Sequence, residues 1–176
     1  MDGNETGYDR AREWLTMFGE CNARLRDVES LLTELDTLDD DMRAQRFDLP
    51  NVHGGDVSDR LGRVIVSRTE RRAELAEERE LLALATANAR RFLHDVAGTL
   101  TDAGAVKGYA YVLARRVHGL KAKQAARLLG LPRTTAAEYE RRFVLAMVDA
   151  EPDRFTREQL PFGWYEFARG EAGGRK

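Results

Sequence analysis

Two long stretches of the sequence repeat their apolar residues at steps of three and four, and they constrain the fold more than any other feature. The first stretch runs from about Asp9 to Asp40 and the second from about Ser58 to Ala97. This spacing places apolar side chains along one stripe of an α-helix, and a helix as long as the first stretch spans roughly 45 Å. Each stripe needs a second helix to cover it. The sequence therefore predicts an all-α protein with two long packed helices.

The segment between the two stretches predicts how they connect. Residues 41–57 hold Pro50, Gly54 and Gly55, which are turn and loop residues. A loop there favours an antiparallel helical hairpin over residues 9–97, with a coiled-coil-like seam. Pairing of these helices between two copies, in a homodimer, satisfies the stripes equally well. The polar, glycine-containing residues 1–8 are expected to be disordered.

Several classes of protein are disfavoured by composition. The single cysteine, Cys21, rules out an internal disulfide framework. No stretch approaches the roughly 18 apolar residues of a membrane span, and the acidic N-terminus is unlike a secretory signal. We therefore expect a cytoplasmic protein without membrane contact. The three histidines lack metal-ligand spacing and no nucleotide or hydrolase motif is present, so we expect no metal, no cofactor and no enzyme.

Charge divides the chain into unlike parts. Residues 105–150 hold nine basic and three acidic side chains, a net charge of +6, within a chain whose net charge is −2. Residues 151–176 are neutral, so residues 1–104 carry −8. A basic segment joined to an acidic one indicates that only one part of a chain contacts nucleic acid.

The basic segment reads as three helices, over Ala105–Val117, Lys121–Leu129 and Thr134–Asp149. Thr101 and Asp102 are candidate caps before the first, and Gly119 suits the left-handed position after it. The inward residues of the first helix are expected to be Val106, Tyr109, Ala110, Leu113 and Val117. Those of the last are expected to be Ala136, Tyr139, Phe143 and Met147. A short helix, a turn with glycine and a longer helix form a helix-turn-helix.

The turn region resembles a known family of DNA-binding domains. The run from Val117 to Thr135, VHGLKAKQAARLLGLPRTT, is similar to the helix-turn-helix of sigma-factor region-four-like domains. The residues that match in order and spacing are Gly119, Ala126, Leu129, Gly130 and Thr135. The departures from the usual pattern are Lys121, Gln124, Pro132 and Ala136.

The wider layout resembles the phage-encoded ArpU/RinA-type transcriptional regulators. In that family a long helical N-terminal region with a Gly-Gly loop precedes such a domain, and here the loop is Val52–Arg60. The resemblance implies a DNA-binding regulator of phage or prophage genes that acts with host RNA polymerase.

The expected DNA contacts lie on the second and third helices of the basic segment. Arginine binds guanine bidentately and pairs well with phosphate, lysines at a helix start suit phosphate contacts, and glutamate accepts from cytosine. Arg115 and Arg116 are candidates for extending the backbone footprint. The predicted site residues are Lys121, Lys123, Gln124, Arg133, Thr134, Thr135, Glu138, Arg141 and Arg142.

Two other functions fit the same residues. One is a protein-interaction module that contacts RNA polymerase without reading DNA, and the other is a phage DNA-packaging or assembly component. The aromatic tail within residues 151–176, with the run LPFGWYEF, either docks onto the helical body or binds a partner.

Overall fold

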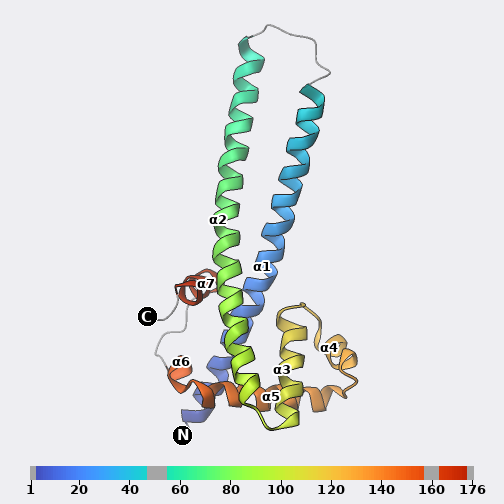
Figure 1. Cartoon of the computed structure of the whole chain (residues 1–176), viewed down its shortest axis with the longest axis vertical. Helices are drawn as coiled ribbons and strands as arrows, with labels where there is room; N and C mark the ends of the chain where they lie inside the picture. Colours follow the sequence, from blue (N-terminus) through green and yellow to red (C-terminus); the bar gives the residue numbers. More distant parts are fainter. Residues whose placement is uncertain (1–2, 47–54, 157–162, 174–176) are drawn as a thin grey trace. The chain divides into compact units, whose positions relative to one another are not determined.

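The computed structural model describes residues 3–46, 55–156 and 163–173, and within them every regular element is an α-helix (Figure 1). The predicted all-α class is therefore confirmed for the described residues, which contain no strand. The helices are α1 (Gly3–Arg46), α2 (Gly55–Thr99), α3 (Ala103–Arg116), α4 (Ala122–Leu128), α5 (Arg133–Ala150), α6 (Pro152–Thr156) and α7 (Trp164–Ala172).

The chain divides into two compact units. Residues 1–24 and 82–176 form the first, which we call the body. Residues 25–81 form the second, which we call the arm. Both long helices contribute to both units. None of the described helices is long and apolar enough to cross a membrane.

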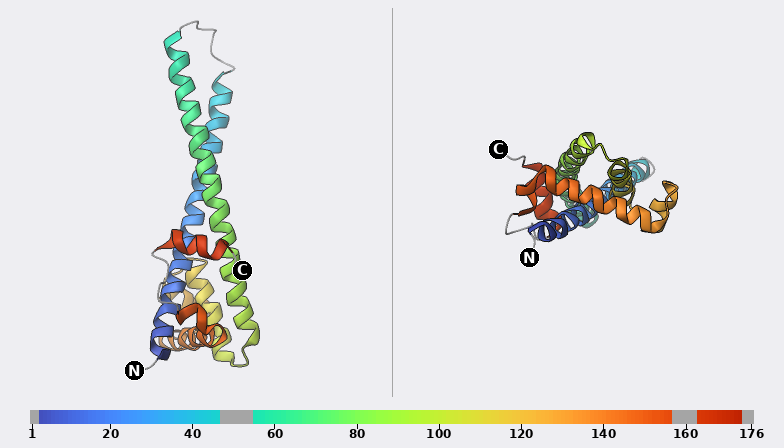
Figure 2. Two further views of the ribbon diagram at one scale, coloured as in Figure 1. Left: turned by 90° about the vertical axis from the view of Figure 1, so that its left-hand side faces the viewer. Right: turned by 90° about the horizontal axis from the view of Figure 1, so that it is seen from below.

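In the arm, α1 and α2 lie side by side and run in opposite directions (Figures 1 and 2). Val28 of α1 and Leu75 of α2 are buried there. Arg72 of α2 forms ion pairs with Asp36 at 2.6 Å and with Asp39 at 3.5 Å. These side chains are about half exposed, so each pair adds little stability. The pairs nevertheless show that α2 partly neutralises the carboxylates of Asp36 and Asp39 on α1.

The body has an aromatic core built from four helices. Trp14 of α1 stacks on Phe18 at 5.8 Å and makes edge contacts with Phe92 of α2 at 5.6 Å and Phe167 of α7 at 5.4 Å between ring centroids. Phe155 of α6 is fully buried beside them. Offset and edge-to-face rings are favourable pairings. The aromatic tail thus docks onto the helical body through Phe167, the first of its two expected roles.

The predicted inward face of α3 is wrong at Val106, although Tyr109 does pack on Phe143 of α5, with ring centroids 5.5 Å apart. Val106 is 43% exposed, whereas Gly104, Gly108 and Val112 are among the buried residues of the helix. The glycines let α5 approach closely: a Cβ at Gly108 would lie 2.0 Å from the backbone oxygen of Tyr139. The helix packs through its glycines, which carry no apolar side chain for a periodicity count to register.

Helix ends differ from their predicted positions by a few residues. α1 begins at Gly3, not near Asp9, and Gly7 is buried with Val148 3.0 Å from its ideal Cβ. The expected disorder of residues 1–8 is therefore wrong for 3–8, which are helical, and Gly7 packs on Val148 of α5. α2 begins at Gly55, so only residues 47–54 of the predicted loop lie outside the described residues.

The two predicted helix-end signals around α3 are confirmed. The Asp102 carboxylate accepts hydrogen bonds from the backbone N–H groups of Gly104 at 3.0 Å and Ala105 at 3.3 Å. Gly119 has φ 67°, the left-handed conformation that glycine adopts without steric cost. Local residue chemistry thus fixed both ends of this helix.

Candidate nucleic-acid interface

A tight turn joins α4 to α5. Gly130 has φ 64°, the N–H of Leu131 donates to the Ala126 carbonyl at 2.9 Å, and Pro132 precedes the first turn of α5. Small buried side chains bring α3, α4 and α5 together beneath this turn, since a methyl group leaves little distance between helix axes. The small residues are Ala114, Ala125, Ala126 and Ala136, and the larger Tyr111 is buried beside them.

Most predicted site residues lie on the outer surface of α4 and α5. Thr135 is half-buried, and Gln124 has a structural role, because its side-chain oxygen accepts a hydrogen bond from the Lys121 N–H at 3.0 Å. That bond satisfies a free donor at the start of α4. The exposed members are Lys121, Lys123, Gln124, Arg133, Thr134, Glu138, Arg141 and Arg142.

Five cations on this surface form no ion pair with any other described residue. All five are exposed. One of them, Arg127, was not among the site residues predicted from the sequence. Its spacing of four residues from Lys123 is the signal for it, because that spacing puts both side chains on one helix face. Unpaired cations are available to an anionic partner. The five are Lys121, Lys123, Arg127, Arg133 and Arg141.

Arg142 and Glu138 already form ion pairs within the body. Arg142 approaches Glu138 at 3.4 Å and Asp102 at 3.5 Å, and its guanidinium lies 5.8 Å from the Tyr139 ring centroid. The hydrogen bond that Arg142 donates to Glu138 raises the pKa of Arg142. Hydrogen bonds from the backbone N–H groups of Gly104 and Ala105, together with the charge of Arg142, lower the pKa of Asp102. A DNA contact by Arg142 or Glu138 must therefore compete with these partners.

Arg115 and Arg116 are poorly placed for the phosphate role suggested by the sequence. Arg115 donates to both carboxylate oxygens of Glu140 at 3.1 Å. Arg116 is half-buried, its Cδ 3.3 Å from the ideal Cβ position of Gly19, and burial lowers its pKa. Both arginines instead tie α3 to its neighbours within the body.

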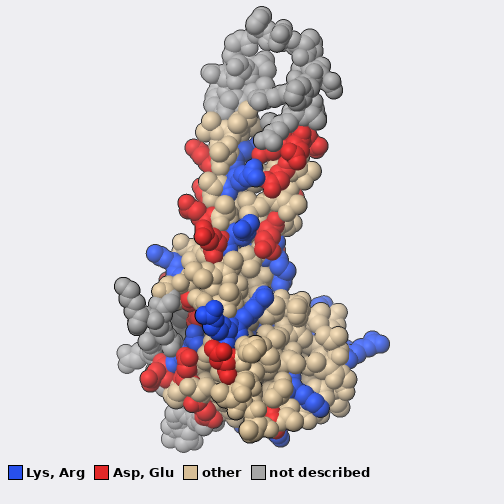
Figure 3. All heavy atoms as spheres, viewed as in Figure 1, with Lys and Arg blue, Asp and Glu red and all other residues tan. Residues whose placement is uncertain are grey.

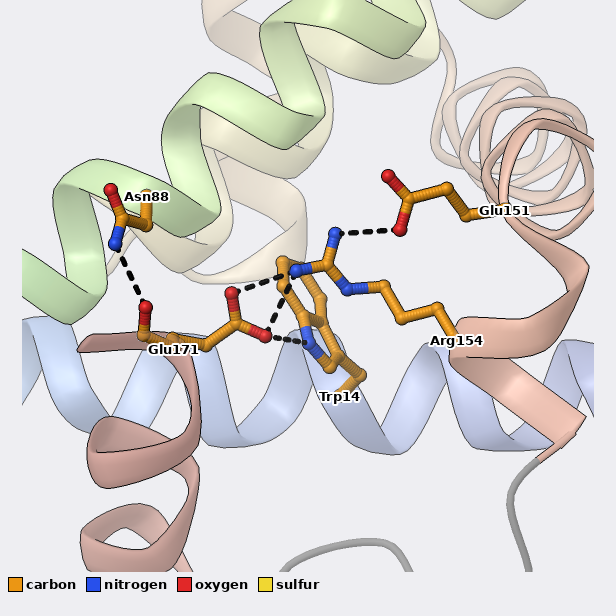
Figure 4. A network of polar contacts seen from close by, with 5 residues as sticks. All are labelled: Trp14, Asn88, Glu151, Arg154 and Glu171. Carbon is orange, nitrogen blue, oxygen red and sulfur yellow. Dashed lines mark hydrogen bonds and ion pairs between the residues drawn. The ribbon is translucent and has the colours of Figure 1, made fainter. Parts of the chain in front are cut away.

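A pocket of about 440 Å³ opens elsewhere in the body, between α2 and the C-terminal helices. Three charged residues of its lining pair with one another (Figure 4). Arg154 contacts Glu171 at 2.8 Å and Glu151 at 3.2 Å, and Asn88 donates to the Glu171 carbonyl at 2.8 Å. The guanidinium carbon of Arg154 also lies 4.0 Å from the centroid of the Phe92 ring. These groups are committed to holding α6 and α7 in place.

Cys21 is expected to resist thiol reagents in the folded protein. It is fully buried, its thiol donates to the Trp164 carbonyl at 3.3 Å, and burial raises its pKa to about 12. Since thiolate is the reactive form, labelling by a disulfide reagent at pH 8 should be slow without denaturant and complete with it. Burial of the protonated Cys21 thiol contributes fully to stability below the thiol's pKa in the unfolded chain, about 8.5. This contribution is lost as the pH rises toward 12. Rapid stoichiometric labelling of the native protein would contradict this burial.

The described residues hold no group of three or more His, Cys, Asp or Glu side chains arranged to bind a metal ion. His53 lies outside the described residues, and His94 and His118 are exposed. Comparisons of the chain with protein-family models, with curated proteins and with solved structures found no match.

Proposed function

We propose that the chain binds double-stranded DNA through the outer surface of α4 and α5 and thereby regulates transcription. The observation that carries the proposal is the set of five exposed, unpaired cations on a short helix, a tight turn and a longer helix. A protein that places unpaired cations along phosphates releases condensed counterions, which drives binding. In this proposal the two helices form a helix-turn-helix, and the arm is a helical hairpin.

Each helix has a distinct role in the proposed complex. α5 enters the major groove with its first turn leading, so Arg133 and Thr134 reach base edges. Lys121 and Lys123 lie at the start of α4 and contact phosphates, which sets the register without reading sequence. Arg141 lies two turns further along α5 and contacts the backbone. The resemblance to sigma region four and to ArpU/RinA-type regulators supports a promoter-proximal site and a role in phage or prophage transcription with host RNA polymerase.

The test is selection of binding sites from a genomic fragment library, followed by affinity measurements on the enriched site. An Arg133→Ala/Arg141→Ala variant is expected to bind at least about 30-fold more weakly, since each arginine contact is worth on the order of 1 kcal/mol or more. Its affinity should also fall less steeply with salt. The matched control is Arg71→Ala/Arg79→Ala on the arm, which removes equal charge from two other exposed arginines and should bind like the unmodified protein.

Two outcomes would contradict the proposal. One is the absence of any enriched site, and the other is equal weakening by both double variants, which indicates a general charge effect. Either outcome favours the protein-interaction module, because Leu128 on α4 is 67% exposed and offers an apolar contact beside the cations.

A further inference from the structure

One side of α1 in the arm exposes leucines that two paired helices leave uncovered. Val28 is fully buried and Leu32 and Leu35 are half-buried, at the steps of four and three of a helix seam. Leu31 and Leu38 lie beside this seam and are 37% and 46% exposed. A seam between two helices needs only Val28, Leu32 and Leu35. Further apolar residues beside such a seam are typical of a helix that packs against an additional partner.

Acidic side chains accompany these leucines. Asp27, Glu34 and Asp41 follow one another at seven-residue steps, are exposed, and form no ion pair with other described residues. Seven residues are close to two helical turns, so the three carboxylates line the same side as the leucines. Figure 3 shows acidic side chains gathered along the outer part of α1. We call this set, Asp27, Leu31, Glu34, Leu38 and Asp41, the arm face.

The negative charge of the arm face determines which kind of surface it can bind. Two arm faces packed together would oppose carboxylates to carboxylates, and like charges in contact are unfavourable. A symmetric dimer through this face is therefore disfavoured. The face instead fits a helix that carries exposed apolar and basic side chains together.

The chain itself carries such a helix. On α4, Lys123 and Arg127 are exposed and form no ion pair with other described residues, and Gln124 is exposed next to them. Leu128 is 67% exposed, more than any other large apolar side chain among the described residues. These four residues, at spacings of one and four, lie on one side of α4 and form what we call the α4 face.

We propose that the arm face of one copy docks onto the α4 face of a second copy. Carboxylates then meet Lys123 and Arg127, and Leu31 and Leu38 shield Leu128 from water. The two surfaces differ, so the contact is head-to-tail and builds rings or open chains of copies. It is small and rich in exposed charge, which makes the association weak and salt-sensitive.

The test uses two charge-reversed variants. An arm variant carries Asp27→Lys and Glu34→Lys, and a face variant carries Lys123→Glu and Arg127→Glu. By sedimentation at low ionic strength, the average mass of the unmodified protein is expected to rise with concentration and to return to that of the monomer at high salt. Each variant alone opposes like charges and should remain monomeric. An equimolar mixture of the two restores opposite charges across the contact and should associate again.

Three results would overturn the inference: a constant monomer mass for the unmodified protein, undiminished association of either variant alone, or no association of the mixture. A constant monomer mass would indicate that the arm face binds a basic helix of another protein instead of a second copy. Where the proposed function also holds, DNA should dissociate the assemblies, because it competes for Lys123. Failure of that competition alone would count against the DNA surface and leave the sedimentation result standing.

Discussion

Replacing Gly108 with alanine is expected to destabilise the body by about 2 kcal/mol or more. The added Cβ would lie 2.0 Å from the backbone oxygen of Tyr139 and 2.6 Å from its carbonyl carbon. Backbone atoms cannot rotate away as a side chain can, so α3 and α5 must separate. Overpacking typically costs about 1–3 kcal/mol and occasionally more, and a clash with backbone atoms belongs at the upper end of that range. The better helix propensity of alanine returns up to about 1 kcal/mol, which leaves a net loss of about 2 kcal/mol.

The control for this prediction is Gly98→Ala on α2. Gly98 is exposed, and no atom outside its immediate neighbours lies within 4 Å of its ideal Cβ, so alanine should be neutral or slightly stabilising. Urea denaturation followed by circular dichroism gives the free energy of unfolding for each variant. Equal stability of the two variants would show that α3 and α5 do not cross as closely as described.

The fold was predictable from the sequence where its cause is local. Apolar spacing identified both long helices, and residue chemistry identified the Asp102 cap and the left-handed Gly119. The packing face of α3 was not predictable in this way, because a buried glycine has no side chain to mark it. The sequence does carry a signal, since Gly104 and Gly108 are four residues apart and leave a smooth surface for a neighbouring helix.

The candidate interface was likewise predictable from the sequence only in part. Charge counting located the exposed cations of α4 and α5, since a surface needs no long-range information to be polar. It could not distinguish Arg141, which is unpaired among the described residues, from Arg142, which is held by Glu138 and Asp102. The Asp102 contact joins residues 40 positions apart and exists only after α3 packs on α5.

Glu171 is the extreme case of a residue whose role depends on the folded chain. Its carboxylate accepts hydrogen bonds from Trp14 at 3.1 Å and from Arg154 at 2.8 Å, across 157 and 17 positions of sequence (Figure 4). In the sequence it lies between Gly170 and Gly173, where nothing marks it as part of the packed body. Only the docking of α7 on the aromatic core gives this carboxylate its partners.

Replacing Glu171 with alanine is therefore expected to destabilise the body by about 3 kcal/mol. The side chains of Arg154 and Glu171 are only 10% and 13% exposed. Removing one partner of a buried pair leaves the other charge without compensation, which typically costs 3–5 kcal/mol. Arg154 keeps its contact with Glu151, so the lower end of that range applies. A Glu171→Gln variant can still accept the Trp14 hydrogen bond and should lose less.

The matched control is Glu74→Ala on the arm. Glu74 pairs with Arg71 at 2.9 Å, a distance close to that of the Arg154–Glu171 pair, but both side chains are more than half exposed. An exposed pair contributes about 0–1 kcal/mol, so this variant should unfold at nearly the same urea concentration as the unmodified protein. Comparable losses in the two alanine variants would mean that Glu171 is solvated in solution and that α7 does not hold its docked position. A loss confined to Glu171→Ala would tie the C-terminal helix to the stability of the body, because water screens the one ion pair and is excluded from the other.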